Sequence, residues 1–414
     1  MGQCIVQLLL AISNTNALAE SSGKLEKYFF EIGYRATYLA GISFSDSSPL
    51  YLLYSWTVKV FLLLLVLSEI WYFFSAPWNM DTFIESVNTI IIQLCAGYKY
   101  KSRLDNKDIF KTLAAAMESS NFDLSTDERK NLLELWRKRN EACLKLLVAL
   151  GTCTIIAWYI YPLLDDLDYN LMVPMRIPYD YKTEALYPAT YVGVIIVFSY
   201  ISYFVMVNDL IIQAHIMHLL CQFAVLNDSC VHILRDCKAN FKRKYFLHIS
   251  NHKLYANRQF QETYINRLGD LVNQHIFILK NTLQLREILS APMLAQLAVS
   301  TTLICSIGYQ VAMLVGNNVT KWLMSFLFLG YNMFVLFIMC RWCEELTIQS
   351  EKIGEAIYFS GWERGIATVP GVRIRILLIM ARAQKPLVLS AGRMYDLSLA
   401  AYANVRFIQL HAFY

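Results

Sequence analysis

Residues 50–74 read LYLLYSWTVKVFLLLLVLSEIWYFF and contain two charged side chains, Lys59 and Glu69. An α-helix rises about 1.5 Å per residue, so this stretch extends about 37 Å, while the hydrocarbon core of a bilayer is about 30 Å thick. A run of this length and apolarity is typical of a membrane-spanning helix. It therefore decides the fold class and predicts an all-α membrane protein.

The same reading of hydropathy predicts six further spans, near residues 81–98, 143–164, 187–212, 291–315, 322–341 and 397–414. The last stretch is the least apolar, so we expect it to contact water or protein. The chain then divides into an N-terminal segment (1–49), spans one to four (50–212), amphipathic helices (213–290), spans five and six (291–342), further amphipathic helices (343–393) and span seven (394–414).

The composition of the whole chain agrees with a membrane protein. Hydrophobic residues make up 56% of the 414 residues and charged residues 17%, whereas a soluble domain averages about 45–50% and about 25%. This composition excludes a soluble enzyme. The formal net charge of +5 is too small an excess for nucleic-acid binding, so no nucleic-acid partner is expected.

The basic residues predict how the chain is threaded through the membrane. Of the 37 Lys and Arg residues, 31 lie in residues 1–49, 99–139, 235–286 and 341–393, and the alternate connections hold three. Because cytoplasmic loops carry the excess of Lys and Arg, the N-terminus is predicted inside and the C-terminus outside. This is opposite to a G-protein-coupled receptor. Residues 5–12 are apolar without a preceding basic residue, so we expect an uncleaved N-terminal segment.

Ionisable residues inside or beside a span are the usual candidates for function in a membrane. Most of those found here lie near span ends, where long side chains can extend to the interface, and this is the interpretation we favour for all but Glu85 and Arg406. The set is Lys59, Glu69, Glu85, Lys145, Asp209 and Arg406.

No pattern in the sequence predicts catalysis or a cofactor. The sequence contains no glycine-rich phosphate loop, nucleophile elbow or paired-carboxylate motif. Cys340 and Cys343 have the spacing of a metal-ligand pair, but a structural zinc site needs four ligands, so no metal is expected. His215 and His218 are interpreted as packed or interfacial. The ten cysteines avoid the predicted outside loops, which argues against a disulfide framework.

Two cytoplasmic segments show the periodicity of amphipathic helices. Apolar residues recur every three or four positions and predict a helix continuous with span five: Ile265, Leu268, Val272, Ile276, Leu279 and Leu283. A second helix is predicted over 373–385, and Pro386 and Gly392 then interrupt the chain before span seven. Apolar stripes below the membrane need a partner, either one another or a neighbouring subunit; we favour the neighbouring subunit.

The stretch after span six contains a distinctive set of residues: Cys343-Glu344-Glu345, Ser350-Glu351, Glu355-Ala356-Ile357-Tyr358, Trp362, Gln384-Lys385-Pro386, Gly392 and Leu397-Ser398-Leu399. This set resembles the pattern of the insect odorant receptors. The predicted topology also resembles this family over the whole chain, and the residue-level similarity is strongest over about 341–402. The related gustatory receptors share part of the pattern.

The resemblance implies an odour-tuned subunit of a ligand-gated, non-selective cation channel. It implies a heterotetramer with a common co-receptor in the plasma membrane of olfactory sensory neuron dendrites, with lipid around it and no enzymatic activity. The last helix would line the pore, where Asn404, Phe407, Ile408 and His411 share one helical side. Arg406 is expected off that side. The chain stops at Tyr414, whereas family members commonly extend a few residues further, so we expect a trimmed tail or a gate supplied by the co-receptor.

The resemblance also implies a pocket for a small volatile ligand among the outer halves of spans two, three, four and six. In span three, Gly151, Thr154, Ile155 and Trp158 form one helical face with a hydroxyl and an indole. The candidates in the other spans are Phe83 and Val87, Tyr187, Tyr191 and Ile195, and Met324, Phe326 and Leu327. The alternative for each is contact with lipid or packing between helices.

Three other classes remain as alternatives. A gustatory-type receptor would be the same class of channel and would be distinguished by whether function needs the co-receptor. A G-protein-coupled receptor disagrees with the loop charges. A transporter or membrane enzyme is disfavoured because the sequence shows neither an inverted repeat of broken helices nor a chain of intramembrane acids.

Overall fold

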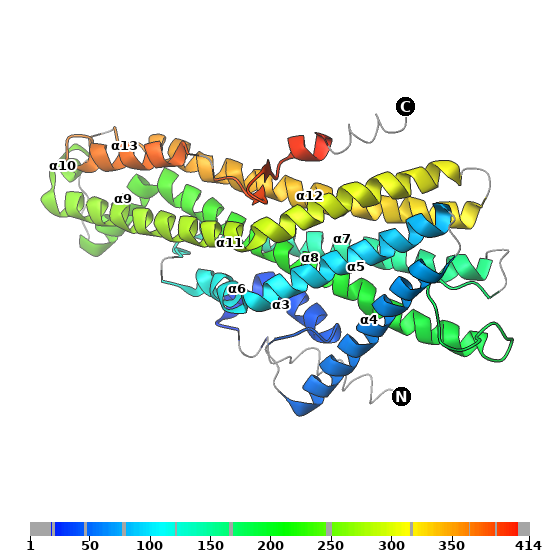
Figure 1. Cartoon of the computed structure of the whole chain (residues 1–414). Helices are drawn as coiled ribbons and strands as arrows, with labels where there is room; N and C mark the ends of the chain where they lie inside the picture. Colours follow the sequence, from blue (N-terminus) through cyan, green and yellow to red (C-terminus); the bar gives the residue numbers. More distant parts are fainter. Residues whose placement is uncertain are drawn as a thin grey trace.

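The computed structural model is an elongated bundle of long α-helices (Figure 1). The structure describes residues 18, 21–44, 48–76, 80–120, 122–164, 169–245, 251–314, 318–363, 365–385 and 387–404. Its elements are α3 (Lys24–Leu39), α4 (Pro49–Ser75), α5 (Met80–Asp105), α6 (Lys107–Ala114), η1 (Ala115–Glu118), α7 (Asp127–Leu164), α8 (Tyr187–Val231), α9 (Ile233–Tyr245), α10 (Asn251–Ala256), α11 (Arg258–Met313), α12 (Val319–Tyr358), α13 (Val372–Ala383), β1 (Ser390–Ala391) and β2 (Tyr395–Asp396).

The helices coincide with the predicted spans. Within the described residues, five helices are long and apolar enough to cross a membrane: α4, α7, α8, α11 and α12, which contain predicted spans one, three, four, five and six. The second span corresponds to α5, which is more polar because it carries acidic and basic residues at its ends. The prediction of an all-α membrane protein with multiple spans is confirmed.

Four of these helices extend far beyond the stretches that hydropathy predicts. The longest, α11, has 56 residues and therefore measures about 84 Å, nearly three times the hydrocarbon thickness. It begins within the predicted amphipathic segment and runs into span five without a break, as the sequence indicates. Hydropathy detects only the apolar part of such a helix, whereas backbone hydrogen bonding continues through the polar part.

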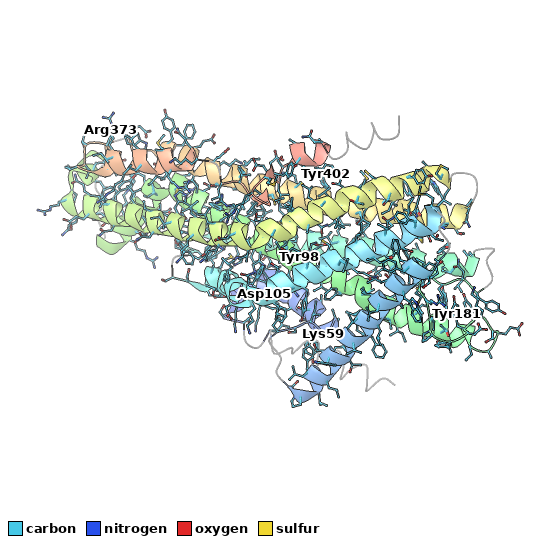
Figure 2. All side chains as sticks on the ribbon, in the orientation of Figure 1. Lys59, Tyr98, Asp105, Tyr181, Arg373 and Tyr402 are labelled. Atoms are coloured by element: carbon cyan, nitrogen blue, oxygen red, sulfur yellow. The ribbon has the colours of Figure 1, made fainter. Side chains whose placement is uncertain are left out.

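The loop predicted outside and several helices predicted inside lie at opposite ends of the bundle. Figure 2 shows Tyr181, in the loop between α7 and α8, at the opposite end of the bundle from Arg373 at the start of α13. The α9, α10 and α13 helices gather at the Arg373 end (Figure 1). The segments richest in Lys and Arg therefore lie together, away from the loop predicted outside.

The apolar stripe predicted on α11 is split between two environments. Leu268 and Leu279 are buried in the main core, whereas Ile276 and Leu283 are exposed. Part of the predicted stripe therefore packs within the chain, and part of it is left exposed. Since α11 packs against several helices along its length, the buried side changes from one turn to the next.

A short hairpin interrupts the chain between α13 and the last helix. Ser390 pairs with Asp396 and Ala391 with Tyr395, and the turn contains Gly392 at a φ of 61°. The backbone N–H of Gly392 donates to the carbonyl oxygen of Ser290 on α11 at 2.8 Å. A Cβ at Gly392 would lie 2.6 Å from Leu294 Cδ2, so both the left-handed φ and the close approach favour glycine. The predicted break is confirmed, and its hairpin form is new.

The pore-facing residues predicted for span seven fall mostly outside the described residues. Asn404 ends the described part of the last helix and is exposed. Phe407, Ile408, His411 and Arg406 lie outside the described residues.

Helix α3 packs against α7 and α8 and was not predicted as a separate element. Its Phe29 ring meets His218 at 5.5 Å and its Phe30 ring meets His215 at 4.6 Å, both edge-on. Both histidines are buried, so their interpretation as packed residues is confirmed. The described cysteines carry free thiols.

A buried histidine in the cytoplasmic part of α11 gives the fold an expected pH dependence. Burial, together with the charge of Arg382, lowers the pKa of His275 to about 4, whereas in an unfolded chain it is about 6.5. As pH falls below about 6.5 the unfolded chain gains a proton that the folded chain resists, so stability present above this pH is lost towards about pH 4.

We therefore expect His275→Gln to reduce the acid sensitivity of the protein, by at most about 3 kcal/mol at pH 4. The measurement is the melting temperature of the purified protein from about pH 7 to about pH 4. An equally steep loss of stability in the variant and the parent chain would contradict the assignment.

Candidate functional site

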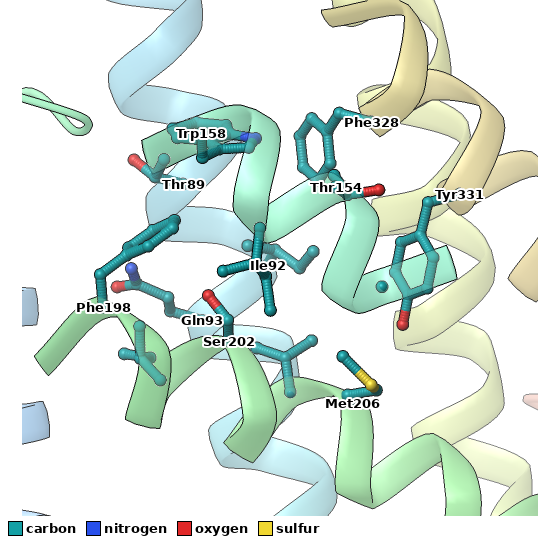
Figure 3. A pocket seen from close by; sticks show the side chains of 14 residues that line it. Thr89, Ile92, Gln93, Thr154, Trp158, Phe198, Ser202, Met206, Phe328 and Tyr331 are labelled. Atoms are coloured by element: carbon teal, nitrogen blue, oxygen red, sulfur yellow. The ribbon is translucent and has the colours of Figure 1, made fainter. Parts of the chain in front are cut away.

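Four helices enclose a cavity with a free volume of about 80 Å³ (Figure 3). The α5, α7, α8 and α12 helices each contribute to its wall, and most of the lining is apolar. The lining residues are Thr89, Ile92, Gln93, Gly151, Thr154, Ile155, Trp158, Phe198, Ile201, Ser202, Val205, Met206, Phe328 and Tyr331.

The wall formed by α7 is the one that helical spacing predicts. Gly151, Thr154, Ile155 and Trp158 all border the cavity. A Cβ at Gly151 would lie 2.4 Å from Met206 Cε, so the glycine lets this methionine approach α7 closely. The face is continuous because residues three and four apart lie above one another on a helix.

Aromatic rings build the apolar end of the cavity. The Trp158 ring lies 5.4 Å from Phe198 on α8 and 5.7 Å from Phe328 on α12, the latter at an interplanar angle of 85°. Such tilted and edge-on pairs are favourable for aromatic side chains. The indole of Trp158 on α7 therefore contacts both α8 and α12 at the wall of the cavity.

None of the eight residues predicted on spans two, four and six lines this cavity. Phe326 is 51% exposed and points away from the bundle, and Phe83 packs against Phe73 of α4 at 5.6 Å. Met324 is buried in the neighbouring apolar cluster. Val87, Ile195 and Leu327 are half-buried, and the cavity wall on their helices starts further along the chain.

The cavity lies deeper than predicted because tyrosines and a loop occupy the outer ends of the helices. The Tyr187 hydroxyl donates to the carbonyl oxygen of Asn170 at 2.7 Å, and the Tyr191 hydroxyl donates to that of Tyr159 at 2.6 Å. Leu171, Met172 and Val173 of the same loop are buried in the apolar cluster that also contains Tyr191. The tyrosines therefore cover the outer end of the bundle instead of lining the cavity.

A buried carboxylic side chain stands behind the α5 wall. Glu69 of α4 is 0% exposed, and its Oε1 accepts a hydrogen bond from Gln93 Nε2 at 3.1 Å. This side chain does not extend to the membrane interface, so that prediction was wrong for Glu69. Sequence reasoning missed Gln93 because one polar residue in an apolar span carries no periodic signal.

A smaller space of about 20 Å³ lies next to the cavity and contains an ion pair. Ile92, Val205 and Tyr331 border both spaces. In the smaller one, Lys99 Nζ of α5 lies 2.5 Å from Asp209 Oδ1 of α8, and both side chains are buried. Asp209 is thus paired inside the protein, contrary to the prediction that it reaches the interface.

A second ion pair lies at the outer end of α5. Glu85 Oε1 lies 2.5 Å from Lys321 Nζ near the start of α12. Together with Lys99 and Asp209, it anchors α5 at both ends to the helices that surround the cavity. Charged groups are favoured in a membrane bundle when they are paired with one another.

The chain is similar in sequence to odorant receptors. The model of the family described as 7tm Odorant receptor matches residues 79–407. Odorant receptor 67a of Drosophila melanogaster is 28% identical over 135 residues, which are 33% of this chain and 32% of the relative. Odorant receptor 13a of the same species is 20% identical over 295 residues, 67% of this chain and 66% of the relative. The chain spans about a third of the length of the first of these relatives.

The fold is similar to that of a solved insect receptor. The structure of the insect olfactory receptor OR5 from Machilis hrabei superposes with a TM-score of 0.76 at 16% identity, covering 94% of this chain and 97% of that chain. The structure of the same receptor in complex with eugenol superposes with the same TM-score and covers 96% of that chain. At this identity the likeness shows a shared fold.

Proposed function

This chain belongs to the odorant receptor family, and from that premise we propose that it is the odour-binding subunit of a ligand-gated, non-selective cation channel. The observation that carries the proposal is the mostly apolar cavity among α5, α7, α8 and α12. Pockets for small molecules are typically concave, apolar and equipped with a few polar groups. The cavity has these properties and suits a small volatile compound.

The similarity to OR5 supports the choice of this class of ligand. That receptor has been solved in complex with eugenol, a small aromatic compound. Aromatic rings on three helices surround the cavity of the present chain, so a compact ring or a short carbon chain is the expected occupant.

Ligand binding is proposed to act on channel opening through the helices that form the cavity. A ligand shifts a closed-to-open equilibrium only if it binds the open arrangement more tightly. Tyr331 is placed to couple the two, because it borders the cavity on one side and the space around Lys99 and Asp209 on the other. Movement of α12 against α5 and α8 would therefore change the packing both at the cavity and at the Lys99–Asp209 ion pair.

The proposed assembly is a heterotetramer with the common co-receptor in the plasma membrane of olfactory sensory neurons. The exposed apolar residues Ile276 and Leu283 of α11, with Ile374, Leu377 and Leu378 of α13, support subunit contact below the membrane. Several exposed apolar side chains on neighbouring helices are typical of an interaction surface. Asn404, Phe407, Ile408 and His411 stay the proposed pore-facing residues.

The test is whole-cell current from cells that express this chain with and without an insect co-receptor while volatile compounds are applied. Current that requires both chains supports the proposal. Current from this chain alone would contradict the heteromeric assembly, and silence toward every compound despite surface expression would contradict the receptor function.

The α7 wall of the cavity yields a mutational prediction. Trp158→Ala removes an aromatic ring that lines the cavity, so we expect the concentration for half-maximal current to rise about tenfold, which corresponds to ~1.4 kcal/mol of lost contact with the ligand. Thr154→Val should change the ranking of ligands by a few-fold, about the effect of one hydrogen bond. Both variants should still reach the cell surface.

Phe326→Ala is the matched control because Phe326 is an exposed aromatic on α12 that does not line the cavity. Its ranking of ligands should equal that of the parent chain. If Phe326→Ala alters the ranking as strongly as Trp158→Ala, the cavity is not the ligand site.

A further inference from the structure

Two threonine hydroxyl groups that line the cavity donate their hydrogens to backbone carbonyl oxygens. Thr89 Oγ1 donates to the carbonyl oxygens of Glu85 at 3.2 Å and Ser86 at 3.1 Å. Thr154 Oγ1 donates to the carbonyl oxygen of Leu150 at 2.9 Å. A hydroxyl has one hydrogen and two lone pairs, so each threonine can offer a ligand only an acceptor.

Gln93 presents an acceptor as well, because a residue outside the cavity orients its amide. Its Nε2 donates to Glu69 Oε1, and its Oε1 is buried with no hydrogen-bond partner among the described residues. The whole side chain is 7% exposed. A buried carbonyl oxygen without a partner is unfavourable, so a ligand that donates a hydrogen bond to it removes this penalty on binding.

The other polar groups at the cavity do not oppose this preference. The hydroxyls of Ser202 and Tyr331 can rotate and serve as donor or acceptor. Figure 3 shows the indole nitrogen of Trp158 on the side of the ring that faces Phe328, and Gln93 on the same side of the cavity as Thr89. Thr89, Thr154 and Gln93, whose hydrogen bonds are set by protein contacts, therefore present acceptors, and the indole N–H of Trp158 is a donor whose position is set by packing.

We propose that the cavity selects ligands that carry a hydroxyl group, small alcohols or phenols, whose O–H donates to Gln93 Oε1. Glu69 is the positioning residue, since it holds the amide with its oxygen free. This inference rests on the proposed function and specifies the ligand class for the same cavity. Ionised acids and amines are disfavoured because they would lose their hydration in a space lined mainly by carbon.

The test compares three compounds with the same number of heavy atoms: benzyl alcohol, ethylbenzene and benzaldehyde. They offer a donor, no polar group and an acceptor, respectively. The aliphatic set of 1-butanol, pentane and butanal repeats the comparison in a smaller size. With the co-receptor present, at least one alcohol should reach half-maximal current at about a tenfold lower concentration than both of its partners, as expected for one added hydrogen bond to a buried group.

Variants of Gln93 and Glu69 test whether these two residues cause the preference for the alcohol. Gln93→Met keeps the length of the side chain without the amide and should reduce the preference for the alcohol to about twofold or less. Glu69→Leu should do the same by releasing the amide, whereas Glu69→Gln can still accept from Gln93 Nε2 and should retain the preference. Ile92→Val alters the same wall without a polar change and should shift all compounds equally.

The preference is a ratio measured on one protein, so it is independent of expression level. If neither alcohol is favoured over its partners in the parent chain, the inference is overturned, while current that requires the co-receptor still supports the proposed function. An alcohol preference that survives in Gln93→Met also overturns it. Complete silence toward all volatiles, with the chain at the cell surface, overturns the proposed function and this inference together.

Discussion

Replacing Arg129 with methionine is expected to remove most of the folded receptor from the cell surface. The guanidinium is 0% exposed and contacts three carboxylates: Asp123 at 2.7 Å, Asp228 at 3.1 Å and Asp236. Removing one partner from a buried ionic cluster costs about 3–5 kcal/mol, because the remaining charges stay buried without compensation. This is a large part of the roughly 5–15 kcal/mol that stabilises a typical domain.

The expected effect is large because the cluster joins four parts of the cytoplasmic end. Arg129 lies at the start of α7, Asp228 on α8 and Asp236 on α9, and Arg267 of α11 also contacts Asp123. Burial raises the pKa of Asp123, but its hydrogen bonds to Ser125 and the charges of Arg267 and Arg129 outweigh burial and leave this pKa below its usual value.

The measurement is surface labelling together with the melting temperature of the purified protein. Arg258→Met is the matched control, since Arg258 pairs with Glu262 at 3.2 Å where both side chains are exposed. Exposed pairs contribute about 0–1 kcal/mol, so this variant should behave like the parent chain. Equal surface levels for the two variants would show that the Arg129 cluster does not stabilise the fold.

Lys99→Met is expected to have the second large effect. Lys99 and Asp209 are 4% and 9% exposed at their side chains, next to the cavity and between α5 and α8. The substitution leaves the aspartate buried in the membrane part of the bundle without its cation, at a cost of about 3–5 kcal/mol. We expect a marked fall in surface receptor and, in consequence, in current.

The double variant Lys99→Met with Asp209→Leu separates a broken pair from a missing lysine. Replacing both members of a buried pair with apolar groups is often neutral or stabilising, so the double variant should recover most of the surface receptor. Lys145→Met is the control, because Lys145 pairs with Glu141 at an exposed position on α7. A double variant as poorly expressed as the single one would contradict this account of the pair.

The sequence predicts those features that depend on local order along one helix. Residues 50–74 and the other apolar runs identify the spans, and the distribution of Lys and Arg predicts their orientation. The face of Gly151, Thr154, Ile155 and Trp158 was also predictable, because three- and four-residue spacing defines a side of a helix wherever the helix lies. The continuous helix from residue 258 into span five follows from the same periodicity.

Other features depend on how the helices are shifted and rotated against one another. The residues of α5, α8 and α12 that line the cavity differ from those predicted, because near the outer end Tyr187 hydrogen-bonds to the loop and Tyr191 to the backbone of α7. The contact of Glu69 with Gln93 joins residues 24 positions apart on two helices, and Arg129 meets carboxylates about a hundred positions away. Periodicity describes one helix at a time, so only the packed structure decides which polar groups become partners and which acceptor is left for a ligand.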